Sequence, residues 1–158
     1  MIKTEQEEFW QGNFGDEYVD RNQSDLLLAS NTSFFSKVFN RTGKIDSIME
    51  FGCNIGMNLK AIRALLPESN LSGIEINKRA VDDLNKWEGK AHVIEGSILD
   101  IELDTRFDLT LIKGVLIHIN PERLDDVYTR LYNFSDKYIC IAEYYNPTPV
   151  TIPYRGHD

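Results

Sequence analysis

A short glycine-bearing loop and an acidic residue downstream of it are the parts of this sequence best suited to chemistry. The loop, Gly-Cys-Asn-Ile-Gly at 52–56, follows the apolar stretch 48–51, which predicts a buried strand that turns directly into a helix. Amides at the start of that helix would face a crevice, and glycines permit a sharp turn and a close approach. Glu75 stands 19 positions beyond Gly56 (75 − 56 = 19), where a carboxylate can accept from both ribose hydroxyls. The loop and the acid together predict a nucleoside site.

The loop departs from the Gly-x-Gly-x-x-Gly fingerprint of dinucleotide-binding proteins. Asn54 stands where a middle glycine is usual, and the acidic Glu50 precedes Gly52 by two positions. This pattern resembles motif I of the class I S-adenosylmethionine-dependent methyltransferases. The resemblance implies a cationic ligand without phosphates. With no phosphates to bind, one loop glycine can be replaced by a small polar residue, and a neighbouring acid suits the positive charge of the ligand. The alternative is an ordinary strand-turn-helix connection that binds nothing.

Strands and helices alternate along the chain. Apolar runs predict strands at 48–51, 71–76, 91–94, 107–113 and 138–142. Helical spacing between these runs favours parallel pairing with right-handed crossovers. The expected fold is α/β and Rossmann-like, as in the class I methyltransferases, with a mostly parallel sheet and helices on both faces.

We expect a single domain over 1–158. It divides into an N-terminal helical cap (1–43), a Rossmann-like core (44–146) and a tail or lid (147–158). A complete fold of the resembled class usually adds two strands that the last segment does not supply. The chain is therefore either a minimal version of the fold or a shortened one.

The composition is that of an ordinary globular domain and excludes some partners. Of 158 residues, 42% are hydrophobic and 27% are charged, which suits one core. The formal net charge of −8 argues against nucleic acid, because phosphate binding depends on clustered Lys and Arg. No apolar run has the length of a membrane span, and the acidic first residues are unlike a signal peptide. Cys53 and Cys140 look like structural thiols, so we expect reduced cysteines in a cytoplasmic protein without a membrane partner.

The first forty residues combine acids with aromatic side chains. Segment 4–22 is too aromatic for a solvated tail, since it holds Phe9, Trp10, Phe14 and Tyr18. This segment either covers the mouth of the crevice or packs as a helix on the sheet edge. Beyond it, a short helix capped by Ser24 and ending at Leu28, and a second helix over 32–40, are expected.

A nucleoside at the carboxyl ends of parallel strands would meet further groups. In the loop after the third strand, Ile98 is expected against the adenine ring and Ser97 at its polar edge. Many enzymes of the resembled class carry an acid after this glycine, and Ser97 departs from that pattern. The expected cofactor-binding residues are Tyr18, Arg21, Gly52, Cys53, Asn54, Gly56, Met57, Asn58, Glu75, Ile76, Ser97, Ile98 and Lys113.

The methionine end of such a ligand needs partners for a carboxylate and an amino group. Tyr18 and Arg21 are candidates for the carboxylate, because a phenol donates one hydrogen bond and a guanidinium two. Arg21 has the alternative of pairing with a surface acid. The backbone carbonyl of Lys113 is expected at the amino group, since an ammonium beside a sulfonium would be unfavourable.

Methyl transfer from a sulfonium is a displacement at carbon, which mainly requires alignment and exclusion of water. His118 is the best-placed general base for a hydroxyl acceptor; its alternative is a structural role in an apolar segment. Tyr144, Tyr145 and Asn146 follow the fifth strand where an acceptor would enter, and they either suit a sugar or form a core-edge cluster. No metal site is expected.

The tail carries Arg155 and His157 after three prolines, Pro147, Pro149 and Pro153. It forms either a lid or a mobile terminus.

Blocks outside the glycine loop resemble one subfamily more closely. They are the aromatic segment 9–22, the glycine loop with its acid, 113–121 and 143–147. They look like the methyltransferases found beside pseudaminic acid biosynthesis, and the resemblance runs from about Phe9 to His157. It implies S-adenosylmethionine as cofactor, S-adenosylhomocysteine as product and a small polar metabolite as acceptor, with a nonulosonic-acid-related sugar as one candidate.

Two other functions stay open at this level, and so does the oligomeric state. A non-catalytic binder of S-adenosylmethionine or S-adenosylhomocysteine would share the same cleft and would fit the missing last strands. A nicotinamide-dependent oxidoreductase would use Glu75 for its ribose, but the absent fingerprint glycine and the small size disfavour it.

Overall fold

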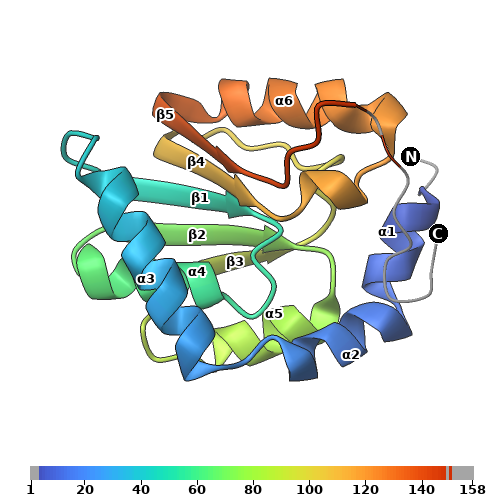
Figure 1. The fold of residues 1–158 in the computed structure, drawn as a ribbon, viewed down its shortest axis with the longest axis horizontal. Coiled ribbons are helices and arrows are strands. Elements are labelled where there is room, and N and C mark those ends of the chain that lie inside the picture. The colour runs from blue at the N-terminus through green and yellow to red at the C-terminus, as the bar shows by residue number, and fades with distance from the viewer. Residues whose placement is uncertain (1–3, 149, 151–158) are drawn as a thin grey trace.

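The computed structural model describes residues 4–148 and residue 150. At its centre lies a sheet of five parallel strands in the order β3-β2-β1-β4-β5 (Figure 1). The strands are β1 (Ser47–Phe51), β2 (Asn70–Glu75), β3 (His92–Glu95), β4 (Phe107–Lys113) and β5 (Ser135–Ala142). The predicted Rossmann-like α/β fold is confirmed. The strand order reverses at β1, which lies between β2 and β4, and a crevice is expected at the carboxyl end of such a switch point.

Helices cover both faces of the sheet. They are α1 (Glu5–Gln11), α2 (Asn13–Arg21), α3 (Asp25–Phe39), α4 (Met57–Leu65), α5 (Lys78–Asn85) and α6 (Leu124–Asn133), with 3-10 turns η1 (Leu116–His118) and η2 (Pro121–Arg123). Within the described part of the chain, no helix has the length and apolarity to cross a membrane.

The alternation of side chains along each strand divides the core into two layers. Ile48 of β1 and Leu111 of β4 pack with α3 and α4 on one face, whereas Met49 and Ile112, one residue further along each strand, pack with α6 on the other. All four side chains are fully buried. Strands buried on both faces explain the continuous apolar runs in the sequence.

Helix α3 is continuous, so the prediction of two shorter helices in this stretch was wrong. Ser24 does cap it, because its hydroxyl accepts from the backbone amide of Leu27 at 3.1 Å. The hydroxyl of Thr32 does not start a new helix and instead donates to the carbonyl of Leu28 at 2.8 Å. Since no proline or glycine lies between these positions, the helix runs on to Phe39.

Helices α1 and α2, which we call the cover, lie beyond the carboxyl ends of the strands (Figure 1). A capping box begins α1: the amide of Thr4 donates to the Glu7 carboxylate at 2.7 Å and the amide of Glu7 donates to the Thr4 hydroxyl at 3.2 Å. Arg79 of α5 donates to the carbonyl of Asp16 at 2.9 Å and pairs with the carboxylate of Asp20. These contacts fix the cover against α5.

The glycine loop (52–56) needs left-handed backbone at three of its five positions. Gly52 and Gly56 have φ of 74° and 75°, and Asn54 has φ of 46°. Asparagine is one of the few side chains that adopt this conformation readily, which explains how Asn54 can stand in place of a glycine. The buried Cys53 packs against Gly73 of β2, where a Cβ atom would lie 2.6 Å from the Cys53 sulfur.

Replacing Gly73 with alanine should therefore destabilise the protein by about 1–3 kcal/mol, because the added methyl overpacks β2 against the glycine loop. Gly43→Ala is the matched control, since its methyl would make only an ordinary 3.6 Å contact with the Tyr138 hydroxyl. Urea unfolding of the two variants measures the difference. Equal urea midpoints in the two variants would show that the glycine loop accommodates the added methyl group without loss of stability.

Candidate functional site

A cavity of about 810 Å³ opens at the carboxyl ends of the strands, beneath the cover. Its walls come from the glycine loop, the ends of β2 and β4, the loop after β3, the cover, α3, η1 and the segment after β5. The predicted site residues that line it are Tyr18, Gly52, Cys53, Asn54, Met57, Asn58, Glu75, Ile76, Ser97, Ile98, Lys113, His118, Tyr144, Tyr145 and Asn146. The aromatic N-terminal segment lies over the crevice, which is the first of the two positions predicted for it.

Two predicted binding residues, Arg21 and Gly56, lie outside this cavity. The guanidinium of Arg21 approaches the Glu17 carboxylate at 3.8 Å and lies 5.4 Å from the centre of the Phe14 ring. Arg21 thus follows the alternative of pairing with a surface acid. A Cβ at Gly56 would lie 2.4 Å from a methyl carbon of Leu84, so this glycine makes room for a side chain of α5 and not for a ligand.

Glu75 is held in one orientation at the end of β2. Its side chain is 7% exposed, and its two carboxylate oxygens accept from the backbone amides of Asn54 and Asn77, both at 2.8 Å. Burial raises the pKa of this carboxyl, against the lowering effect of the same amides. Each oxygen has a second lone pair, so a fixed carboxylate that lines the cavity can still accept from two hydroxyls.

A second buried acid, Glu50, lies outside the cavity lining but next to Asn58, which is part of it. The amide nitrogen of Asn58 donates to its Oε1 at 2.6 Å, whereas Glu50 Oε2 and Asn58 Oδ1 are buried without a protein hydrogen-bond partner. Burial raises the pKa of Glu50 to about 8, although the Asn58 hydrogen bond and the charge of Lys113 both lower it. Buried acceptors without donors indicate a place for a donor from a ligand.

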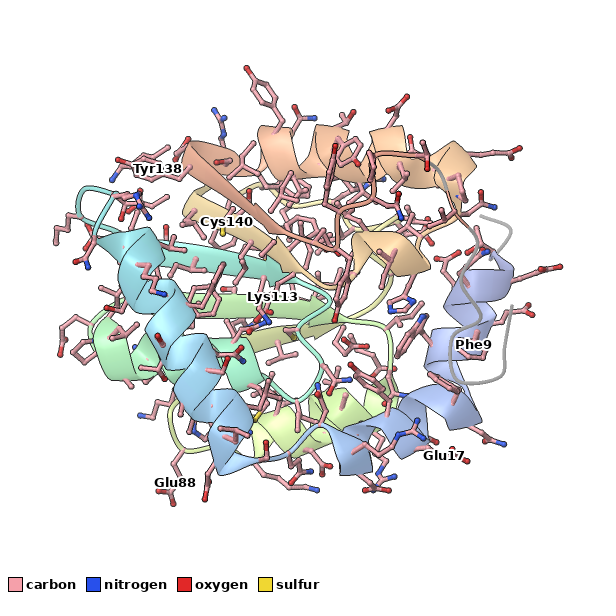
Figure 2. The ribbon with its side chains drawn as sticks, in the orientation of Figure 1. Phe9, Glu17, Glu88, Lys113, Tyr138 and Cys140 are labelled. Carbon is pink, nitrogen blue, oxygen red and sulfur yellow. The ribbon has the colours of Figure 1, made fainter. Side chains whose placement is uncertain are left out.

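Lys113 lies at the carboxyl end of β4, near the tips of the central strands (Figure 2). Among the described residues that line the cavity, it carries the only ammonium or guanidinium group. The described cavity lining therefore combines one cation with two buried acids, Glu7 and Glu75.

His118 stacks against the cover. Its ring centre lies 4.6 Å from that of Trp10, at an interplanar angle of 58°. Burial lowers the pKa of His118 to about 4, so its imidazole is neutral near pH 7. The turn that carries it is fixed by Glu143, whose Oε1 accepts from the amides of Val115 and Leu116 at 2.8 and 3.1 Å. Both the base and the structural interpretations of His118 fit this geometry.

Tyr144 and Tyr145 stand at the open side of the cavity, where they are 81% and 88% exposed. Asn146 follows them along the same wall. The tail residues Arg155 and His157 lie outside the described residues.

The cavity also contains residues that sequence reasoning did not propose. Asn31 of α3 is 4% exposed and lines it, on the same helical face as Leu27 and Phe35. A polar residue in an apolar stripe was the available signal. Gln6 and Glu7 of α1 line the cavity as well. The only signal for them in the sequence was the mixture of acidic and aromatic residues in this segment.

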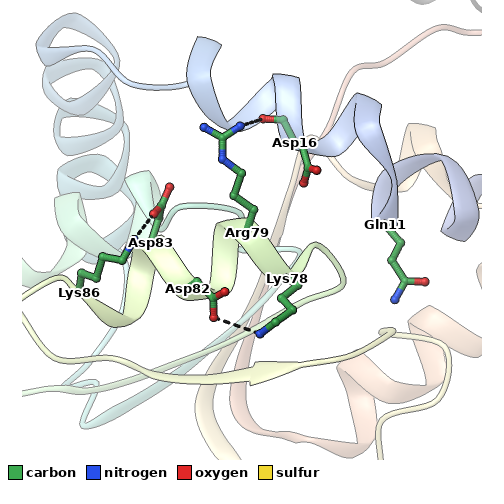
Figure 3. Close-up of a pocket in the computed structure, with 7 residues that line it drawn as sticks. All are labelled: Gln11, Asp16, Lys78, Arg79, Asp82, Asp83 and Lys86. Atoms are coloured by element: carbon green, nitrogen blue, oxygen red, sulfur yellow. Dashed lines mark hydrogen bonds and ion pairs between the residues drawn. The ribbon is translucent and has the colours of Figure 1, made fainter.

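A second hollow, of about 470 Å³, lies between the cover and α5 (Figure 3). Its cations are already matched: Lys78 lies 3.3 Å from Asp82 and Lys86 lies 2.7 Å from Asp83. With these pairs formed, the hollow offers an incoming anion little, and the hydrogen bond from Arg79 to the Asp16 carbonyl joins α5 to α2 beside it.

No protein-family model matches the chain, and no curated protein matches it in sequence. Solved structures do resemble it. The plantazolicin methyltransferase BpumL in complex with S-adenosylhomocysteine matches with a TM-score of 0.68 at 21% identity, over 87% of this chain and 56% of its own. Streptomyces venezuelae DesVI matches with a TM-score of 0.69 at 13% identity, over 90% and 62% respectively.

A third match is the sugar N-methyltransferase KedS8 from Streptoalloteichus sp., with a TM-score of 0.69 at 15% identity, over 87% of this chain and 56% of its own. The chain thus spans between about half and two thirds of the length of the structures it matches. At these identities the likeness establishes the fold, which is that of the Rossmann-like methyltransferases.

Proposed function

We propose that this protein is an S-adenosylmethionine-dependent methyltransferase that acts on a small polar metabolite. The observation that carries the proposal is the fixed Glu75 carboxylate at the end of β2, which faces a cavity bounded by the glycine loop. A carboxylate in this position suits a ribose diol. The neighbouring structures with the same fold include one solved with S-adenosylhomocysteine and one named a sugar N-methyltransferase, which supports this ligand and this class of reaction.

The order of the strands sets the order of the ligand's parts. Ribose at Glu75 lies at the end of β2, so the adenine extends toward β3, where Ile98 offers an apolar wall. The methionine part then extends toward β1 and β4. There its ammonium meets the backbone carbonyl of Lys113 and the unpartnered Oδ1 of Asn58, whose amide nitrogen binds the buried Glu50, and its carboxylate meets Tyr18.

The acceptor enters between His118 and the exposed tyrosines. Aromatic walls with polar tips at Tyr144, Tyr145 and Asn146 suit a sugar, and a nonulosonic-acid-related sugar follows from the family resemblance alone. The protein's main contribution to methyl transfer is alignment of the acceptor with the methyl group under a cover that excludes water.

Glu75→Gln should weaken S-adenosylhomocysteine binding by about 10- to 100-fold, because hydrogen bonds to a charged acceptor contribute about 1.5–3 kcal/mol. Glutamine is preferable to alanine here, since it keeps the shape of the side chain and one of the two oxygens that hold backbone amides. Titration calorimetry measures the affinities. Glu95→Gln is the control. Glu95 of β3 lies in register with Glu75 of β2, but it is outside the cavity lining. Unchanged affinity in Glu75→Gln, or tight binding of NAD by the natural protein, would contradict the proposed ligand.

Cofactor binding should release a proton near pH 7. Glu50, with a pKa of about 8, is mostly protonated in the free protein, and a ligand ammonium favours its charged form. Affinity should then rise by up to about tenfold per pH unit between pH 6 and 8. Calorimetry of S-adenosylhomocysteine in buffers of different ionisation enthalpy measures the release.

Two controls accompany this prediction. Glu50→Gln should bind without proton release, and so should 5′-methylthioadenosine in the natural protein, because that nucleoside lacks the amino-acid part and its ammonium. A binding enthalpy of S-adenosylhomocysteine independent of the buffer would refute the role of Glu50.

His118→Ala should slow methyl transfer to a hydroxyl acceptor by about 100-fold or more, with little change in S-adenosylhomocysteine affinity, if His118 is the base. Because its pKa is about 4, the rate at saturating cofactor should show no histidine limb between pH 6 and 7. Tritiated-methyl incorporation into a panel of sugars and sugar nucleotides measures the rate, with His92→Ala on β3 as control. Equal rates in the two variants return His118 to a structural role, and no transfer to any acceptor favours a non-catalytic binder.

A further inference from the structure

We propose that Glu7 of α1 accepts a hydrogen bond from the 6-amino group of the bound adenine and thereby selects adenine over 6-oxo purines. The inference deepens the proposed function and rests on it. It assigns to the cover a role in base recognition, in addition to covering the ligand.

Glu7 has the position that this role requires. It lines the cavity together with Gly96, Ser97 and Ile98, the loop at the end of β3 toward which the adenine extends. Its side chain is only 8% exposed, and its carboxylate accepts a hydrogen bond from the Ser97 side chain. The carboxylate therefore lies beside the edge where the ring's polar atoms are expected.

The hydrogen bonds of Ser97 leave its hydroxyl less to offer than the Glu7 carboxylate. Its oxygen accepts from the amide of Leu99 at 3.0 Å, which leaves one lone pair, and its single O–H donates to Glu7. An amino group needs acceptors, and Glu7 offers Oε1, since both hydrogen bonds from Thr4 go to its Oε2. Gln6 of the same helix offers a second acceptor. Its Oε1 is buried in this cavity wall without a hydrogen-bond partner.

The charge state of Glu7 is consistent with this role. Burial acts to raise its pKa, but hydrogen bonds from Ser97 and Thr4 and the positive charge of Arg123 outweigh it, so the net pKa is lowered. Glu7 is therefore an ionised acceptor at neutral pH. A 6-oxo purine would set a carbonyl oxygen against this carboxylate, and two acceptors repel one another.

The experiment compares two ligands that differ at one exocyclic atom, S-adenosylhomocysteine and its hypoxanthine analogue S-inosylhomocysteine. Calorimetry gives the affinity ratio for each variant. The natural protein should prefer the adenine ligand by about tenfold or more. Glu7→Ala should reduce this ratio to within about threefold, and Glu7→Gln should also reduce it, because the glutamine amide can donate to the 6-oxo group.

Thr4→Ala is the matched control, since it breaks the same capping box but leaves the carboxylate in place. It should keep the natural ratio even if both affinities fall. Glu8→Ala, on the exposed side of α1, should change neither affinity nor ratio.

An unchanged ratio in Glu7→Ala, or an equal loss of both affinities, would overturn the inference and reduce Glu7 to a helix cap. If the natural protein binds neither ligand, the proposed function falls and the inference with it. If it binds both equally well, only the inference falls.

Discussion

The buried carboxylate of Glu75 fixes the position of three parts of this molecule. It accepts from the amides of Asn54, in the glycine loop, and of Asn77, at the start of α5. Asn77 in turn accepts from the amide of Ala80 and donates to the carbonyl of Trp10 and the carboxylate of Asp16 in the cover. One charge at the end of β2 thus positions the loop, the helix and the cover. A buried charge is stable only when such donors surround it, which is why these parts occur together.

The cavity floor carries a polar group that folding alone does not satisfy. Glu50 and Asn58 each keep a buried acceptor without a donor, although most buried polar groups in proteins are paired. Leaving these acceptors unpaired costs stability, and a ligand ammonium would supply the missing hydrogen bonds. The same burial that raises the pKa of Glu50 would make it sensitive to an incoming cation, and this is the basis of the proposed coupling between its protonation and binding.

The cover belongs to the site as much as the sheet does. The Trp10 ring packs at a tilt against His118, Glu7 accepts a hydrogen bond from Ser97, and Tyr18 lines the same cavity. Each contact joins a helix from the first twenty residues to a loop at a strand's carboxyl end. Such loops vary freely in a Rossmann-like fold, and substrate preference is expected to lie in them and in the cover, while the strands supply the invariant frame.

The sequence by itself determined the strands, the glycine loop and the acid of β2, because these depend on local periodicity and on conformations that few residue types adopt. It also predicted half of the residues that line the cavity, since the carboxyl ends of parallel strands meet at one edge. Only the tertiary structure decided that Arg21 pairs with Glu17, that Gly56 makes room for Leu84, and that Asn31 and Glu7 line the cavity. Those outcomes depend on which helical face meets which loop, across separations that no local pattern encodes.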